Sequence, residues 1–162
     1  MKAPNEAEML HRMAAYCSTA ERCVQDVRKK VEACLPADAA GRIIARLTEE
    51  RFIDENRFAR SFVNDKLRFN KWGRVKIACE LGKRNIPPAI CREALDGIDE
   101  AAYRSILLAL LKEKKKNIRG KDERDEFAKL LRFAAGRGFE SRETIPCLRQ
   151  LFKGNDYGND FE

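Results

Sequence analysis

Residues 53–84 carry the side chains that are best suited to chemistry. Asp54 and Glu55 lie near the start of this segment, and most of the residues after them are arginine, lysine or apolar. Two adjacent carboxylates could form an acid–base or metal-binding pair, but neighbouring side chains diverge by about 100° on a helix, and no histidine lies near them. They suit a helix start better, with Asp54 capping backbone N–H groups and Glu55 in the first turn.

Basic side chains continue from this helix start into the following segment. At helical spacing the apolar residues take one broad side, and the arginines take a narrow stripe opposite. Few acidic residues lie at helical pairing distance, so we expect the stripe to face outward without internal neutralisation. Guanidinium groups can hold phosphates or carboxylates, so DNA, an acidic protein surface and plain solvent all remain open as its surroundings. The predicted binding surface consists of Arg57, Arg60, Arg68, Lys71, Trp72, Arg74, Lys76, Lys83 and Arg84.

The sequence gives little support to an enzyme. His11 is the only histidine, no Gly-rich phosphate-binding loop is present, and no nucleophile–base pair can be proposed. We expect no catalytic residue, no metal site and no cofactor. The six cysteines form no Cys-x-x-Cys pair, and we expect most of them to be small buried thiols. The run 112–126 mixes seven basic and five acidic residues, which is typical of a helix end and a solvated loop.

Net charge is unevenly distributed along the 162 residues. The total is +7, with zero in residues 1–50, +6 in 51–90 and +1 in 91–162. A localised excess creates a directional field, so it says more about partners than a high pI does. No apolar run is long enough to span a bilayer, and residues 1–13 lack the apolar core of a signal peptide. We therefore expect a cytoplasmic protein without membrane contact.

The elements that must position these residues are helices. Apolar residues recur at helical spacing between short breaks at proline and glycine, and no alternating run indicates a strand. "STAE" at 18–21 is predicted to be a capping box. Asn85 and Gly138 are predicted to end helices in the left-handed turn, and Leu35, Ile86 and Phe139 are predicted to be equivalent positions of an internal repeat of about fifty residues.

The repeat predicts an all-α fold of three tandem three-helix repeats, stacked into an elongated, curved body. We place an N-terminal tail at 1–8, the repeats at 9–50, 51–98 and 99–153, and a C-terminal tail at 154–162. The predicted core of the second repeat is Phe58, Phe62, Ile77, Leu81, Ile86 and Leu95.

Several motifs resemble those of the RecX family. The match begins with L-x4-F-I-D-E-x-R-F-A over Leu47–Ala59, and "GRGF" at 136–139 resembles the last repeat of that family. Members often have a second Gly or Lys-Gly-Pro where this chain has Lys71-Trp72-Gly73-Arg74, so the large Trp72 departs from the family pattern. The similarity covers about residues 10–152 and continues through Lys71-Trp72-Gly73, Ile77, Glu80-Leu81, Ile86 and Ala94-Leu95.

The resemblance implies a non-enzymatic regulator. Members are small bacterial proteins of three three-helix repeats that bind the RecA recombinase filament and restrain its activity. By this resemblance we expect a monomer that binds the RecA filament, with direct but weak contact to single-stranded DNA. The alternative is a helical DNA-binding protein that acts alone through its central basic residues.

Overall fold

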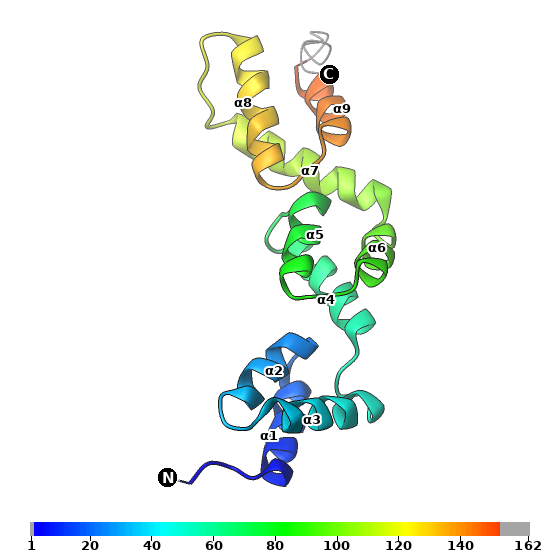
Figure 1. The fold of residues 1–162 in the computed structure, drawn as a ribbon. Helices are drawn as coiled ribbons and strands as arrows, with labels where there is room; N and C mark the ends of the chain where they lie inside the picture. Colours follow the sequence, from blue (N-terminus) through cyan, green and yellow to red (C-terminus); the bar gives the residue numbers. More distant parts are fainter. Residues whose placement is uncertain (1, 153–162) are drawn as a thin grey trace. The chain divides into compact units, whose positions relative to one another are not determined.

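The computed structural model describes residues 2–152, and every regular element in that range is an α-helix (Figure 1). This confirms the predicted all-α class. Helices follow one another in three consecutive triplets, joined by short turns at the predicted breaks. None of the helices in the described part is long and apolar enough to cross a membrane. The elements are α1 (Glu6–Thr19), α2 (Val24–Glu32), α3 (Ala37–Glu49), α4 (Glu55–Arg68), α5 (Arg74–Lys83), α6 (Pro88–Asp96), α7 (Glu100–Lys115), α8 (Glu123–Gly136) and α9 (Ser141–Leu151).

The first helix begins earlier and ends later than predicted. The Asn5 side chain accepts a hydrogen bond from the backbone N–H of Glu8 at 2.8 Å, and the Glu8 carboxylate accepts from the backbone N–H of Asn5. This capping box starts α1 at Glu6, inside the segment predicted to be a tail. The capping box predicted at 18–21 is wrong, because Ser18 lies within α1 and its hydroxyl donates to the carbonyl of Ala14.

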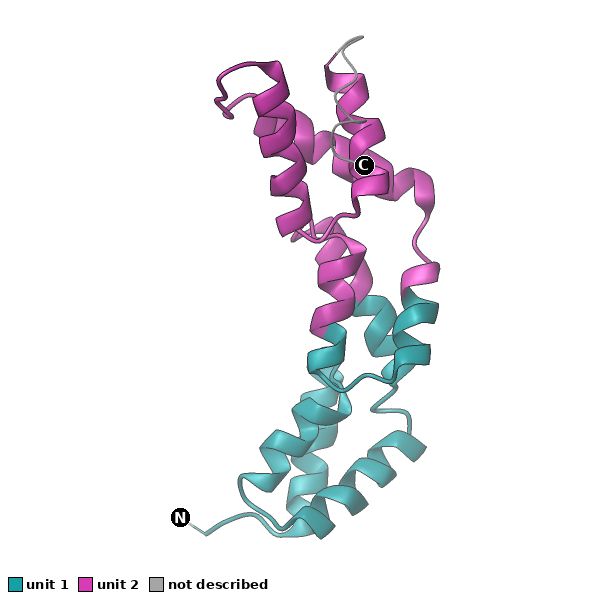
Figure 2. Cartoon of the chain, turned by 45° about the horizontal axis from the view of Figure 1, so that its top comes forward, with its two compact units in different colours: residues 1–62, 81–94 teal, residues 63–80, 95–162 magenta. Residues whose placement is uncertain are grey.

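The chain divides into two compact units that do not follow the triplet boundaries (Figure 2). The first comprises residues 1–62 and 81–94, and the second comprises residues 63–80 and the chain from residue 95 onward. The second triplet is therefore shared between the units, and the repeat boundaries given above stay predictions. The predicted C-terminal tail and residue 153 lie outside the described residues.

The core of the first unit is built by α1, α2 and α3. Apolar residues at three- and four-residue spacing on each helix turn inward, and Val27, Val31 and Leu47 are fully buried. Ile53, just before α4, completes the cluster. Its buried members are Met9, Met13, Val27, Val31, Ala40, Ile43, Ile44, Leu47 and Ile53.

The core of the second unit is formed mainly by α7, α8 and α9. Tyr103 of α7 packs against Phe139 with ring centroids 5.3 Å apart, and Phe127 of α8 packs against Phe152 at 5.5 Å. Such tilted aromatic pairs contribute stability beyond the area that they bury. Further fully buried residues are Leu107, Leu111, Leu130, Ala134 and Leu148.

Five of the six residues predicted for the core of the second repeat are buried. Leu95 is half-buried at the end of α6, so its prediction is wrong. The expectation for the cysteines is also wrong, since only Cys23 and Cys147 are buried among the six. The left-handed turns are confirmed, with φ of 59° at Asn85 and 92° at Gly138.

Candidate nucleic-acid interface

The carboxylates at the start of α4 serve the backbone. Asp54 accepts a hydrogen bond from the N–H of Arg57 at 3.0 Å, as expected of a helix cap. Glu55 accepts from the N–H of Val24 at 2.9 Å and thereby supports the start of α2. Burial raises the pKa of Glu55 although this hydrogen bond acts in the opposite direction. Neither carboxylate belongs to a group that could hold a metal within the described residues.

Arg57 is held inside the first unit, so the expectation that it faces outward without a partner is wrong. Its Nε donates to Glu21 at 2.6 Å, and its Nη2 donates to the carbonyl of Arg51 at 3.2 Å. A second carboxylate, Asp54, lies 3.9 Å away. The guanidinium group therefore ties the α1–α2 turn to the segment before α4, and we assign it a structural role.

The other predicted residues of the first unit lie on α4 and at the end of α5. Arg60 is exposed, and residues 2–152 offer it no ion-pair partner. Lys83 is exposed and Arg84 is half-buried. The Arg84 guanidinium lies 4.7 Å from the centroid of Phe62, which is only 9% exposed. Phe62 is thus a core side chain beneath a cation, not a platform for a base.

Arg74, in the second unit, also has a structural role instead of the predicted outward one. Only 15% of its side chain is exposed. Nη1 donates to Glu140 at 3.0 Å, Nη2 donates to Glu100 at 2.7 Å, and the guanidinium lies 3.9 Å from the centroid of Tyr103. An arginine engaged on every side in this way has little left to offer a ligand.

The carboxylate of Glu140 is the shared acceptor for the side chains of Arg74 and Tyr103. The Tyr103 hydroxyl donates to it and accepts from the backbone N–H of Arg74 at 3.0 Å. Burial acts to raise the pKa of Glu140, but the hydrogen bonds from Tyr103 and Arg74 outweigh it, so that pKa is lowered. Burial also raises the pKa of Tyr103. The network fixes the start of α5 against the α8–α9 turn.

Four predicted residues of the second unit lie around the turn between α4 and α5. Lys66 and Lys76 place their ammonium groups 5.0 and 4.7 Å from the centroid of Trp72, which is half-buried between them. Arg68 is exposed and donates to Asn64. Lys71 is also exposed and adopts a left-handed conformation, with φ of 57°. Trp72 thus positions two cations and is itself covered.

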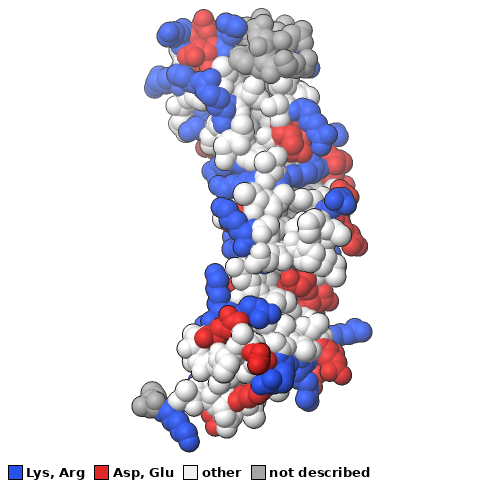
Figure 3. Space-filling model, in the orientation of Figure 1, with Lys and Arg blue, Asp and Glu red and all other residues white. Residues whose placement is uncertain are grey.

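Charge of one sign gathers over this part of the molecule. Figure 3, in the orientation of Figure 1, shows lysine and arginine side chains along the edge on which α5 lies, with few acidic side chains beside them. The N-terminal helices mix the two signs. The sequence agrees, since residues 66–76 contain five cations and no acid.

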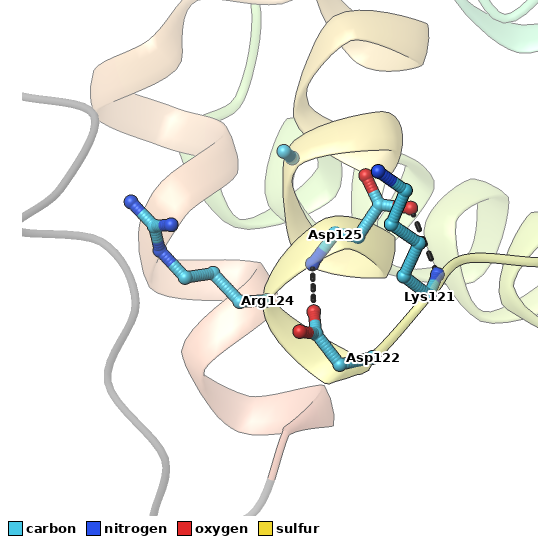
Figure 4. A pocket seen from close by; sticks show the side chains of 5 residues that line it. Lys121, Asp122, Arg124 and Asp125 are labelled. Carbon is cyan, nitrogen blue, oxygen red and sulfur yellow. Dashed lines mark hydrogen bonds between the residues drawn. The ribbon is translucent and has the colours of Figure 1, made fainter.

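A shallow depression lies at the start of α8, lined in part by Lys121, Asp122 and Asp125 (Figure 4). Asp122 accepts from the N–H of Asp125 at 2.8 Å, and Asp125 accepts from the N–H of Lys121 at 3.0 Å. The hydrogen bond from Lys121 lowers the pKa of Asp125. Asp122 caps α8, and Asp125 holds the backbone just before it, as Figure 4 shows. The predicted helix end and loop at 112–126 differ only in that α8 has already begun at Glu123.

Comparison with known proteins decides the family. Residues 54–95 match a family model described as RecX, second three-helix domain. A regulatory protein RecX from Prosthecochloris aestuarii is 30% identical over 143 residues, which cover 88% of this chain and 92% of that protein. The chain belongs to the RecX family. Another regulatory protein RecX, from Chromohalobacter salexigens, is 37% identical over 73% of this chain and 74% of its own length.

Two solved RecX structures share the fold. The protein from Lactobacillus salivarius superposes with a TM-score of 0.80 at 18% identity and covers 91% of this chain and 96% of its own. A second RecX crystal structure gives 0.79 at 22% identity, over 93% of this chain and 72% of that one. These agreements confirm the RecX resemblance and the three-helix triplets predicted from the sequence. Most of the basic excess lies within the segment that matches the RecX family model.

Two features of this RecX chain escaped the sequence analysis. Phe69 is 79% exposed, although helical spacing places it on the same side as Phe58 and Phe62. Phe69 directly follows α4, which ends at Arg68, and its N–H still bonds the carbonyl of Asp65 at 2.8 Å. The periodicity misleads because it does not show that the buried side of the helix stops before this last turn. Arg137 donates to the carbonyl of Asn70 at 3.1 Å, across 67 residues of sequence. No local signal could have revealed that contact.

Proposed function

We propose that this protein binds the RecA filament on single-stranded DNA and inhibits the recombinase and ATPase activity of RecA. The observation that carries the proposal is family membership, since relatives that share most of their length with this chain are named regulatory protein RecX. The basic residues supply a means of contact, because a recombinase filament on DNA offers both phosphates and carboxylates. No step of this function needs a catalytic group.

The proposed contact residues are those predicted basic side chains that form no ion pair within residues 2–152. Arg57 and Arg74 are excluded because their guanidinium groups are held by carboxylates of the same unit. Trp72 acts indirectly, through the two lysines on its ring. Lys83 and Arg84 are left out because both already interact with other groups of the chain. The set that remains is Arg60, Arg68, Lys71 and Lys76, which we call the basic set.

The direct test measures the single-stranded-DNA-dependent ATPase and the strand exchange of RecA with substoichiometric amounts of the protein. We expect inhibition by the wild type and its loss in the triple variant Arg60→Glu, Arg68→Glu, Lys71→Glu. The matched control is Arg12→Glu, Lys29→Glu, Lys112→Glu, which changes three exposed cations elsewhere and alters the net charge equally. Exposed substitutions of this kind usually change the free energy of unfolding by less than about 0.5 kcal/mol. Equal inhibition by both variants would refute a role for the basic set.

A second candidate function is binding to DNA without RecA, which the concentration of cations in residues 66–76 favours. It predicts equal affinity for bare single strands and for the assembled filament. Tighter binding to the filament would favour the RecA-dependent function.

A further inference from the structure

Two apolar side chains are exposed beside the turn between α4 and α5. Phe69 is 79% exposed and Val75 is 60% exposed. They are the most exposed large apolar residues in the described range. Single exposed apolar residues are common on protein surfaces. Here the two lie six residues apart in the same unit, which marks the turn as a candidate contact.

The turn that presents Phe69 is held in place by hydrogen bonds. The backbone N–H of Trp72 donates to the carbonyl of Lys66 at 3.1 Å, and that of Gly73 donates to Arg137 at 2.8 Å. The guanidinium group of Arg137 in turn donates a hydrogen bond to the carbonyl of Asn70. These bonds fix the backbone on both sides of Phe69, so a ligand would have to order only the side-chain torsions of the ring and not the turn itself.

The surroundings of Phe69 are cationic. Arg68 precedes it and Lys71 follows two residues later; both are exposed, and neither forms an ion pair within residues 2–152. Trp72, the other aromatic of the turn, carries an ammonium group close to its ring from each of two lysines. Phe69 makes no ring contact with another described side chain. The ring of Phe69 is therefore the aromatic surface of this turn on which a ligand could stack.

We propose that Phe69 stacks on a base of single-stranded nucleic acid, while Arg68 and Lys71 hold the adjacent phosphates. Sites for single strands combine cations that follow the backbone with an aromatic ring on which a base stacks. An acidic peptide would satisfy the cations, but it would need a separate apolar side chain at the right distance to cover the ring, whereas every nucleotide carries a phosphate and a flat base together. The inference rests on the proposed function only in taking single-stranded DNA as the ligand.

The test uses the full chain and fluorescence anisotropy with a labelled thymidine oligonucleotide. Its partner is a strand of the same length in which the sugars lack bases, so that only phosphates are offered. Phe69→Ala removes the ring, Phe69→Tyr retains it, and Val75→Ala is the control that shortens the other exposed apolar side chain. Trp72 is the only tryptophan, so its emission also reports whether a ligand reaches the turn.

We expect Phe69→Ala to weaken binding to the thymidine strand roughly tenfold, as for the loss of one stacked base. Phe69→Tyr and Val75→Ala should bind like the wild type, and the abasic strand should not distinguish Phe69→Ala from the wild type. A wild-type protein that binds no single strand, or a Phe69→Ala variant that binds thymidine normally, overturns the inference. A variant that binds DNA normally but no longer inhibits RecA assigns Phe69 to a protein contact and also overturns it.

These outcomes are separable from those of the proposed function. If the wild type inhibits RecA while Phe69→Ala binds thymidine normally, the stacking inference fails and the proposed function stands. If binding depends on Phe69 but the wild type leaves RecA unaffected, the stacking inference stands and the proposed function fails.

Discussion

Arg57 and Arg60 lie three residues apart on α4 and differ completely in their surroundings. Arg57 bonds the Glu21 carboxylate and two backbone carbonyls of the preceding segment, whereas Arg60 points into solvent. A helix projection groups them on one stripe because it records direction around a single axis. It contains no information about Glu21, which lies in the turn between α1 and α2, 36 residues away in the sequence.

The two arginines are expected to respond differently to charge reversal. Arg57→Glu loses hydrogen bonds to a carboxylate and places a negative charge beside Glu21 and Asp54, so we expect a loss of about 1–3 kcal/mol in the free energy of unfolding. Arg60→Glu should change it by less than about 0.5 kcal/mol. Urea unfolding followed by circular dichroism measures both. Equal stability of the two variants would show that the Glu21 contact contributes nothing in solution.

At the scale of elements, the start of α5 is joined to the α8–α9 turn by backbone as well as by charge. The N–H of Gly73 donates to Arg137, and the N–H of Val75 donates to Gly138 at 3.0 Å. A Cβ added to Gly73 would overlap the backbone of Gly138 and Phe139. Gly138 itself has a φ of 92°, a backbone angle that residues with a side chain rarely adopt. Both glycines are therefore required by geometry.

Alanine substitutions should separate this close approach from ordinary helix propensity. Gly73→Ala must push two backbone segments apart, and we expect a loss of at least about 2 kcal/mol in the free energy of unfolding. Gly136→Ala meets no atom within 4 Å and lies in α8, so it should be neutral or stabilising by up to about 1 kcal/mol. Thermal and urea unfolding test the pair. A Gly73→Ala variant as stable as Gly136→Ala would rule out the tight contact.

The sequence predicted the helices and their left-handed ends because periodicity and turn residues are local signals. It failed where local signals were ambiguous. Ser18 matched a capping box, yet its hydroxyl bonds a carbonyl of the same helix and α1 continues. It also failed for Arg57 and Arg74, whose partners Glu21 and Glu140 lie 36 and 66 residues away. The candidate site therefore stays a prediction, and local signals could not divide its charged segment into cations with a structural role and exposed cations.

At the scale of the whole molecule, the position of the charge matters more than its sum. The net charge of +7 comes almost entirely from residues 51–90. Within that segment, Arg57 and Arg74 form ion pairs with carboxylates of their own units, so their charges are neutralised. The electrostatic field near a ligand therefore comes mainly from the basic set. This holds for each unit by itself, since members of the set belong to both units.

Salt dependence should reveal which cations contact phosphates. Each phosphate neutralised on a single strand contributes about 0.7 to the slope of log affinity against log salt, because counterions are released. We expect Arg60→Gln and Arg68→Gln each to lower the magnitude of the slope by about this amount if they contact DNA. The controls Arg12→Gln and Lys29→Gln remove the same charge from exposed positions outside the basic set and should leave the slope unchanged. The measurement is a salt titration of oligonucleotide binding by anisotropy. Equal reductions of the slope in all four variants would mean that net charge alone drives binding. The basic set would then contribute no more to binding than the other surface cations.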